Sequence, residues 1–245
     1  MNSPVPILSK RRRALMLLLA ILLAAPWSGI SARNISWGSQ PFDSLFDSTG
    51  TALDASFVFE IGSFANGFVP TYENMVYWEA NWKPFDRAVN GDGWNPGASY
   101  FNSISNLKAD GTPQFSPVAP AFTFAENEVG YMWIYDSLSF EPTSEWALIT
   151  NTSGDFNAAD DWLFPDPADQ SNPQNVYFTL VNASEIVVGG LNNNQGDGRF
   201  SADPGTFSLQ TSVVPEPGSV MLLAAAGLLL RVQRGRSGQR RQPRR

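Results

Sequence analysis

Two short apolar runs, each next to a cluster of basic residues, enclose an acidic middle segment. The first run, Ala14 to Ala25, follows the basic residues Lys10 to Arg13, and the second, Val220 to Leu230, precedes seven arginines. The middle segment, Arg33 to Val214, contains five basic and 22 acidic residues, which gives it a net charge of −17. Both apolar runs are short for membrane-spanning helices. We therefore expect the hydrophobic core to be built from the middle segment.

Composition excludes several classes of function. A segment this acidic repels phosphate groups, so we expect no nucleic-acid partner. The chain contains no cysteine and no histidine. Disulfides, thiolate nucleophiles and Ser-His triads are therefore excluded, as are metal sites that depend on sulfur or imidazole. Any bound metal would be a hard cation held by oxygen atoms, and calcium is the one candidate cofactor.

The N-terminal run has the features of a secretory signal peptide that covers residues 1–32. Lys10 to Arg13 form its basic start, and the 12 residues from Ala14 to Ala25 form its apolar centre. Small residues follow, with a suitable cleavage site near Ser31 or Ala32. An uncleaved anchor or a buried helix is the alternative. Because twelve apolar residues are few for a membrane span, a signal peptide is the favoured interpretation.

The C-terminal residues 213–245 form three consecutive parts: the Pro215-Glu216-Pro217 motif, the apolar run Val220 to Leu230, and an arginine-rich tail. The two prolines prevent a regular helix through the motif, which keeps it extended and accessible. As a helix, the 11-residue run covers about 17 Å of a hydrocarbon core about 30 Å thick. The arginines favour a cytoplasmic end. We therefore expect a short transmembrane anchor, removable by cleavage, that holds the acidic domain outside the cytoplasm.

This order of motif, short apolar helix and basic tail resembles the PEP-CTERM sorting signal of exported Gram-negative bacterial proteins. The resemblance implies that an exosortase-type membrane transpeptidase recognises Pro215, Glu216 and Pro217 and cleaves nearby, which sends the protein to the cell surface or out of the cell. The tail departs from the family pattern because it is longer and is interrupted by Gln, Ser, Gly and Pro. Members of this family have diverse mature domains, so the resemblance predicts a destination and not an activity.

Between residues 33 and 212 the sequence predicts a single, mostly β, sandwich-like domain. Apolar and aromatic residues alternate in short runs, separated by turns rich in Gly, Pro, Asn and Asp. The run from Val129 to Tyr135 is apolar on both faces, which is typical of a strand in the centre of a layered fold. The predicted strands centre on Phe57 to Ile61, Val129 to Tyr135, Trp146 to Thr150, Val176 to Val181, Ile186 to Val188 and Phe207 to Leu209.

One segment of the domain predicts a helix instead of a strand. Its apolar residues, which include Met75, Trp78 and Trp82, recur at helical spacing. Thr71 can cap the start, and Pro84 can end the helix. We therefore predict one short helix over Tyr72 to Lys83, packed on the sheet.

Two polar segments have some of the features of a calcium loop. In the segment Asn192 to Gly198, numbering from Asn193 puts Asp197 and Gly198 at the fifth and sixth positions, but Pro204 occupies the twelfth, where an acid is needed. The second segment, Asp155-Phe156-Asn157 with Asp160 and Asp161, fits no better. We therefore interpret both as polar turns and predict no metal ligand.

Three pairs of acids have the composition of a glycosidase site: Glu126 with Glu128, Asp160 with Asp161, and Glu79 with Asp86. Such catalysis needs two carboxylates at a set distance across a cleft, and a chain with this many acids contains close pairs by chance. We therefore expect no catalytic residue and no enzyme.

The tryptophans of the middle segment can fill a core or form platforms for sugar rings. Trp94 lies in the turn NGDGWNPG, and we expect it to be the most exposed of them. The leading interpretation is a non-catalytic cell-surface or extracellular-matrix protein, with exopolysaccharide as a candidate partner. A carbohydrate-binding module with a platform at Trp94 is the alternative, and a glycan-active enzyme is the third interpretation.

Overall fold

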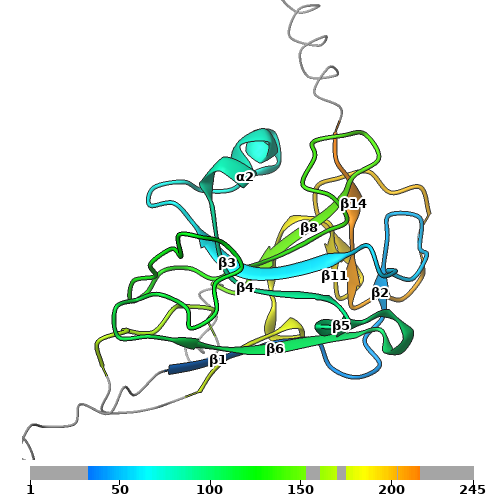
Figure 1. Ribbon diagram of the computed structural model, residues 1–245. Coiled ribbons are helices and arrows are strands. Elements are labelled where there is room, and N and C mark those ends of the chain that lie inside the picture. The colour runs from blue at the N-terminus through cyan, green and yellow to red at the C-terminus, as the bar shows by residue number, and fades with distance from the viewer. Residues whose placement is uncertain (1–32, 153–160, 170–174, 203, 216–245) are drawn as a thin grey trace, which may run out of the picture. The chain divides into compact units, whose positions relative to one another are not determined.

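The computed structural model describes residues 33–152, 161–169, 175–202 and 204–215. These residues form a mostly β, sandwich-like domain around a strongly curled sheet (Figure 1). The predicted fold class is therefore confirmed. The expected signal peptide, the Glu216-Pro217 part of the sorting motif, the apolar run after it and the arginine-rich tail lie outside the described residues.

The curled sheet contains ten strands, nine of which follow the order β10-β8-β7-β3-β4-β5-β6-β1-β9. The tenth strand, β14, shares one edge of β8 with β10, while β7 pairs with the other edge. Most neighbours are antiparallel, but β4 with β5 and β1 with β9 are parallel. The strands are β1 Arg33–Gly38, β3 Val58–Phe64, β4 Trp82–Asn90, β5 Gly93–Asn95, β6 Tyr100–Leu107, β7 Tyr131–Tyr135, β8 Glu145–Thr150, β9 Val176–Thr179, β10 Glu185–Val188 and β14 Ser212–Val213.

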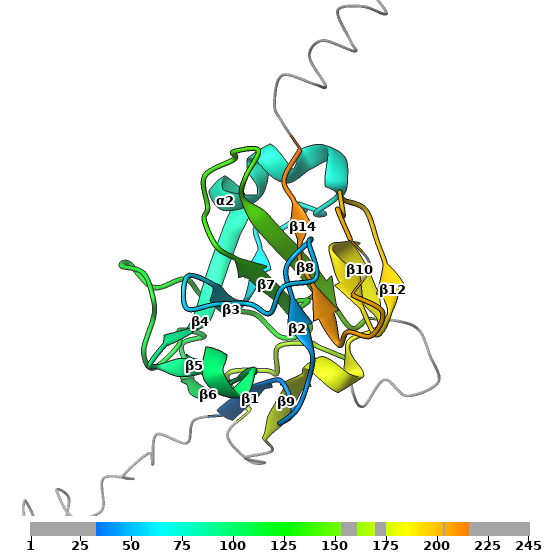
Figure 2. The same cartoon turned by 90° about the vertical axis from the view of Figure 1, so that its right-hand side faces the viewer.

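A second sheet of four very short strands, in the order β12-β11-β13-β2, packs against the curled sheet. Figure 2 looks toward this side of the domain, with β2 in front. Its leucines Leu45, Leu191 and Leu209 are almost fully buried and join the core inside the curl. The four strands are β2 Leu45–Phe46, β11 Gly190–Leu191, β12 Asn194–Gln195 and β13 Leu209–Gln210.

The central strands β3, β7 and β8 bury both of their faces, which the sequence predicts for the run that contains β7. On β7, Met132 and Ile134 point into the core inside the curl, while Trp133 and Tyr135 point to the opposite side. There the rings of Trp133, Trp78 and Trp146 lie 5.1–5.9 Å apart. Such aromatic pairs add about 0.5–1.5 kcal/mol each beyond their burial. Two separate cores therefore hold the middle of the sheet in place.

The predicted helix is present and covers the second of these cores. It consists of a 3-10 turn, η1 Tyr72–Tyr77, followed directly by α2 Trp78–Asn81. Thr71 precedes it in extended conformation, and its backbone N–H donates to the Asn74 side chain at 2.8 Å. The predicted end at Lys83 is wrong by two residues. Lys83 precedes a proline, which disfavours helical backbone, and it pairs instead with β3.

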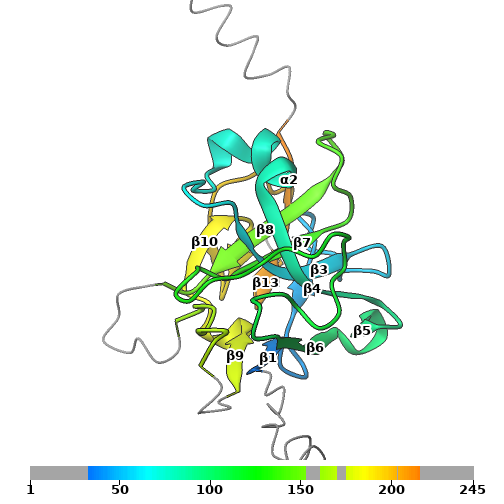
Figure 3. The same ribbon diagram turned by 60° about the vertical axis from the view of Figure 1, so that its left-hand side comes forward.

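Pro84 therefore lies inside a strand and not at the end of the helix. It sits where the pairing of β4 with β3 shifts register, a position where a strand tolerates a residue without a backbone N–H. Two further 3-10 turns, η2 Pro96–Ala98 and η3 Leu180–Asn182, connect strands. Figure 3 shows β9, β1 and β6 as a layer on the side of the domain away from α2.

The folded part of the chain continues past Ser212. Strand β14 pairs Ser212 and Val213 with Trp146 and Glu145 of β8. The next residue, Val214, is fully buried in the tryptophan-rich core, and its N–H donates to the Ser144 carbonyl at 2.8 Å. Pro215, the first residue of the predicted sorting motif, thus follows directly after a core residue.

Candidate functional site

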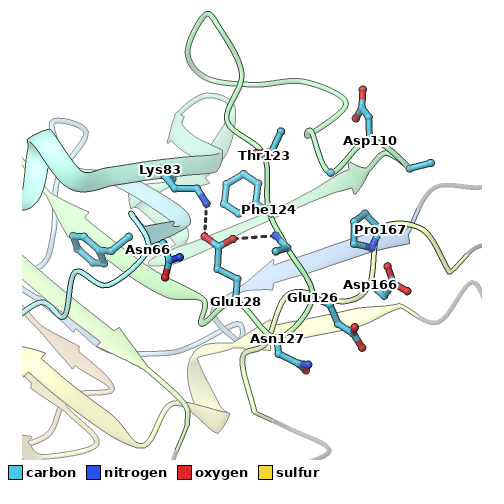
Figure 4. Close-up of a pocket in the computed structure, with 14 residues that line it drawn as sticks. Asn66, Lys83, Asp110, Thr123, Phe124, Glu126, Asn127, Glu128, Asp166 and Pro167 are labelled. Carbon is cyan, nitrogen blue, oxygen red and sulfur yellow. Dashed lines mark hydrogen bonds and ion pairs between the residues drawn. The ribbon is translucent and has the colours of Figure 1, made fainter.

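A pocket with a volume of about 820 Å³, which we name the acidic pocket, is bordered by three loops and by the start of β4 (Figure 4). The loops contribute acidic residues that include Asp110, Glu126, Glu128 and Asp166, and β4 contributes one cation, Lys83. A catalytic or metal site here would need several of these carboxylates to point toward one common position.

The carboxylate of Glu128 is occupied by neighbouring groups of the protein. Its carboxylate forms an ion pair with Lys83 and accepts a hydrogen bond from the Ala125 N–H at 3.0 Å. The Lys83 ammonium also lies 4.8 Å from the centroid of the Phe124 ring, a cation–π distance. Both charged side chains are mostly buried, with 16% and 17% exposed. This group therefore ties the loop over residues 124–128 to β4.

Two of the other three acids of the pocket, Asp110 and Asp166, bind to their own turns. Asp110 accepts hydrogen bonds from the side chain and backbone of Thr112, which lower the pKa of its carboxyl. Asp166 accepts from the Ala168 N–H at 2.8 Å. In Figure 4, Glu126 points away from the Lys83–Glu128 pair. The Glu126 and Glu128 carboxylates thus do not face each other across a cleft.

The remaining predicted acid pairs are not brought together either. Asp86 accepts a hydrogen bond from the Trp37 indole in the core inside the curl, at 2.8 Å. Glu79 lies on α2, which packs on the opposite core. Asp160 is outside the described residues. Within the part of the chain that the structure describes, there is no group of three or more acidic residues that could hold a metal ion.

The polar segment at Asn192 forms a tight hairpin turn, as we interpreted it. Asn192 and Asn193 both have positive φ, of 50° and 66°, and connect β11 directly to β12. Asparagine tolerates this conformation better than most residues. The Asn193 side chain also accepts a hydrogen bond from the Phe207 N–H at 2.6 Å. The other segment considered for calcium, around Asp155, lies outside the described residues.

The expected exposure of Trp94 is wrong. Only 2% of this residue is exposed, and its ring lies 4.8 Å from that of Phe59 in the core inside the curl. Its indole N–H donates to the Asp54 carbonyl at 2.9 Å. Because β5 pairs with β6, Trp94 stands opposite the buried Phe101 and points inward with it. A sugar platform at Trp94 is therefore excluded.

The other face of the same strands is exposed and carries no charge. Cross-strand neighbours share a face. Asn34 is opposite Asn106, Ser36 is opposite both Ile104 and Tyr177, and Gly38 is opposite Asn102. We name this surface of β6, β1 and β9 the amide face; it consists of Asn34, Ser36, Asn102, Ile104, Asn106, Asn175 and Tyr177.

Hydrogen bonds connect the side chains of the amide face. Asn34 donates to the Asn175 side-chain oxygen at 3.2 Å, and Asn175 donates to the Tyr177 hydroxyl at 3.2 Å. Asn106, opposite Asn34, donates to the Gln114 side chain. The two large side chains, Ile104 and Tyr177, are 65% and 55% exposed. None of the predicted strands covers Tyr100 to Leu107, because its apolar and polar residues do not alternate: Ile104 is exposed and Ser105 is buried.

A second pocket, with a volume of about 360 Å³, adjoins the amide face at the β5 end. It is lined by the side chains of Asn90, Asn95, Asn102 and Tyr100, with Trp94 and two glycines beside them. Asn102 belongs to both the pocket and the amide face. The two features therefore form one continuous surface of amides, hydroxyls and aromatic rings.

One charged cluster is buried in the sheet itself. Glu60 on β3 is 1% exposed and stands directly opposite Arg87 on β4. Its carboxylate accepts from the Arg87 guanidinium and from the Trp82 indole, both at 2.6 Å. Burial, with the nearby Glu60 carboxylate, raises the pKa of the Tyr135 hydroxyl well above its ordinary value. This cluster compensates the buried charge of Glu60 and links the neighbouring strands β4, β3 and β7.

Comparisons of the chain with protein-family models, with curated proteins and with solved structures found no match. Among the described residues, no helix has the length and apolar character needed to cross a membrane. The chemistry of the described residues is therefore the basis for assigning a site.

Proposed function

We propose that this protein is an exported, non-catalytic component of the cell surface or extracellular matrix. The observation that carries the proposal is the order of Pro215-Glu216-Pro217, the apolar run Val220 to Leu230 and the arginine-rich tail. An apolar run this short is a strained permanent span, whereas it suffices to hold a chain at the membrane before cleavage.

The position of the motif relative to the fold supports this proposal. Val214 belongs to the core, so the recognition residues begin immediately outside the folded domain. A sorting enzyme that cleaves after Val214 would release the domain with β14 and its last core residue in place. Cleavage before Val214 would remove part of the fold.

The arrangement of the acidic pocket favours a role without catalysis. A glycosidase needs one carboxylate as acid and another as base or nucleophile, facing each other. Glu128 is neutralised by Lys83, and Asp110 and Asp166 bind to their own turns. This pocket is therefore better suited to holding its loops in place than to bond cleavage.

Mass spectrometry of the protein from fractionated native cells tests the proposal. We expect the mature species at the cell surface or outside the cell, ending after Val214 and lacking Val220 to Arg245. Replacing Pro215-Glu216-Pro217 with alanines should leave the full chain in the inner membrane. The matched control replaces Glu141-Pro142-Thr143, an exposed loop of similar composition, and should be processed normally. A main species that keeps the arginine tail in the inner membrane refutes sorting and leaves a tail-anchored protein.

A further inference from the structure

We infer that the amide face and the adjoining pocket bind a neutral, hydroxyl-rich polysaccharide. This inference rests on the proposed function, because it assigns a partner to an exported, non-catalytic domain. It concerns a different surface from the Trp94 platform that the structure excludes.

The side chains of this surface match the chemistry of sugar hydroxyls. Each asparagine amide offers two N–H donors and an oxygen that accepts two hydrogen bonds. The Asn34–Asn175–Tyr177 chain uses only part of this capacity within the described residues, and it fixes the orientation of the groups that remain. A ligand therefore meets polar groups that are already ordered, which lowers the entropic cost of binding.

Tyr177 and Ile104 provide the apolar part of the surface. Both flank Ser36, one on each neighbouring strand, so their backbones lie about 10 Å apart at ordinary strand spacing. A tyrosine presents a flat apolar ring together with a hydroxyl that can hydrogen-bond. Sugar rings likewise combine an apolar C–H face with polar edges. Ser36 between the two larger side chains leaves room for a ring to lie against the sheet.

Electrostatics selects a neutral polymer over a charged one. None of the seven residues of the amide face is charged, whereas the segment from Arg33 to Val214 has a net charge of −17. An anionic polysaccharide would be repelled by the domain as a whole. A cationic polymer would be drawn to carboxylates elsewhere, such as those around the acidic pocket. A neutral chain is the partner that an uncharged surface on an acidic domain favours.

The shape of the surface suits an extended chain more than a protein partner. The amide face crosses three strands and continues over β5 into the pocket of about 360 Å³. In Figure 1 the side of β1 and β6 that points away from β3 and β4 carries no other labelled element. Protein interfaces usually have an apolar, aromatic centre, whereas here asparagines surround two isolated large side chains. A polysaccharide is therefore the favoured occupant, and a second copy of this chain is an outcome of the test.

Affinity electrophoresis of the full-length chain, purified in detergent, tests the inference. The gels contain dextran, hydroxyethylcellulose or laminarin as neutral polymers, and alginate as an anionic one. We expect retardation by at least one neutral polymer and none by alginate. Tyr177→Ala should raise the dissociation constant about tenfold, and Asn34→Asp should weaken binding by a similar factor.

Matched controls separate binding from folding. Tyr77→Ala removes a tyrosine of similar exposure, 60%, from η1 on another part of the domain. Asn66→Asp adds the same negative charge to an exposed loop that lines the acidic pocket. Both variants should bind like the wild type, and all four should keep the wild-type circular dichroism spectrum and melting temperature.

Three results would overturn the inference. The first is failure of every neutral polymer to retard the wild type; if the mature protein is still found at the cell surface, the proposed function stands without this partner. The second is undiminished binding by Tyr177→Ala and Asn34→Asp, which moves the site elsewhere. The third is a dimer in analytical ultracentrifugation that Tyr177→Ala converts to a monomer, which would make the amide face a protein interface.

Discussion

Replacing Arg87 by methionine should reveal how much the fold depends on its buried charge. Methionine keeps much of the length of the arginine stem but cannot donate to Glu60. The Glu60 carboxylate, 1% exposed, would keep the Trp82 indole as a donor but lose its counter-charge. A buried charge without a counter-charge strongly destabilises the folded state, because desolvation is no longer compensated.

The magnitude follows from the burial of the two partners. Breaking a fully buried pair costs about 3–5 kcal/mol. The Arg87 side chain is 35% exposed, so water screens part of the interaction, and we expect a loss of about 2–3 kcal/mol. For a domain of this size, that loss corresponds to a fall in melting temperature of roughly 4–12 °C.

Urea unfolding followed by tryptophan fluorescence measures this loss. The double variant Glu60→Gln/Arg87→Met, which removes both charges, should recover most of the stability that Arg87→Met loses. A loss below about 0.5 kcal/mol, or a double variant as unstable as the sum of the two single variants, would refute the reasoning.

Three further predictions concern single positions. Burial raises the pKa of Glu145, despite hydrogen bonds from Ser48 and Thr211, so the folded state holds this proton more tightly than the unfolded state. Its contribution to stability is therefore complete below the ordinary glutamate pKa of 4.5 and is lost as pH rises through the pKa of the folded state. In Glu145→Gln, the free energy of unfolding in urea should therefore change less between pH 4 and 7 than in the wild type. An unchanged pH profile would contradict this. Trp94→Ala should lower the free energy of unfolding by about 3–5 kcal/mol, and a loss under about 1 kcal/mol would show that the indole is not a core side chain. Val214→Asp should destabilise the domain by several kcal/mol in the same assay, whereas wild-type stability would remove the physical reason for cleavage after this residue.

The sequence determined the parts of the fold in which local pattern and tertiary environment agree. Strands β3, β7 and β8 are buried at every position except the first, and they are rich in apolar and aromatic residues, which makes them easy to recognise as strands. The short helix from Tyr72 follows from the spacing of Met75 and Trp78. Its end did not follow, because pairing with β3 makes Trp82 and Lys83 extended. The spacing of apolar residues along the chain cannot show that strand pairing competes with the helix at these residues.

The exposed half of the sheet depended on tertiary structure. Strands β1 and β6 are rich in asparagine and serine, and in β6 the apolar Ile104 is exposed while Ser105 is buried, so their sequences resemble loops until partner strands pair with them. The burial of Trp94 was decided by the pairing of β5 with β6, which turns a residue in a glycine-rich turn toward the core. The amide face was decided in the same way. Asn34, Asn106 and Tyr177 are far apart in the chain, and only the antiparallel pairing of β1 with β6 and the parallel pairing of β1 with β9 bring them onto one surface. Composition determined that this domain is acidic, and strand register decided where its surface is neutral.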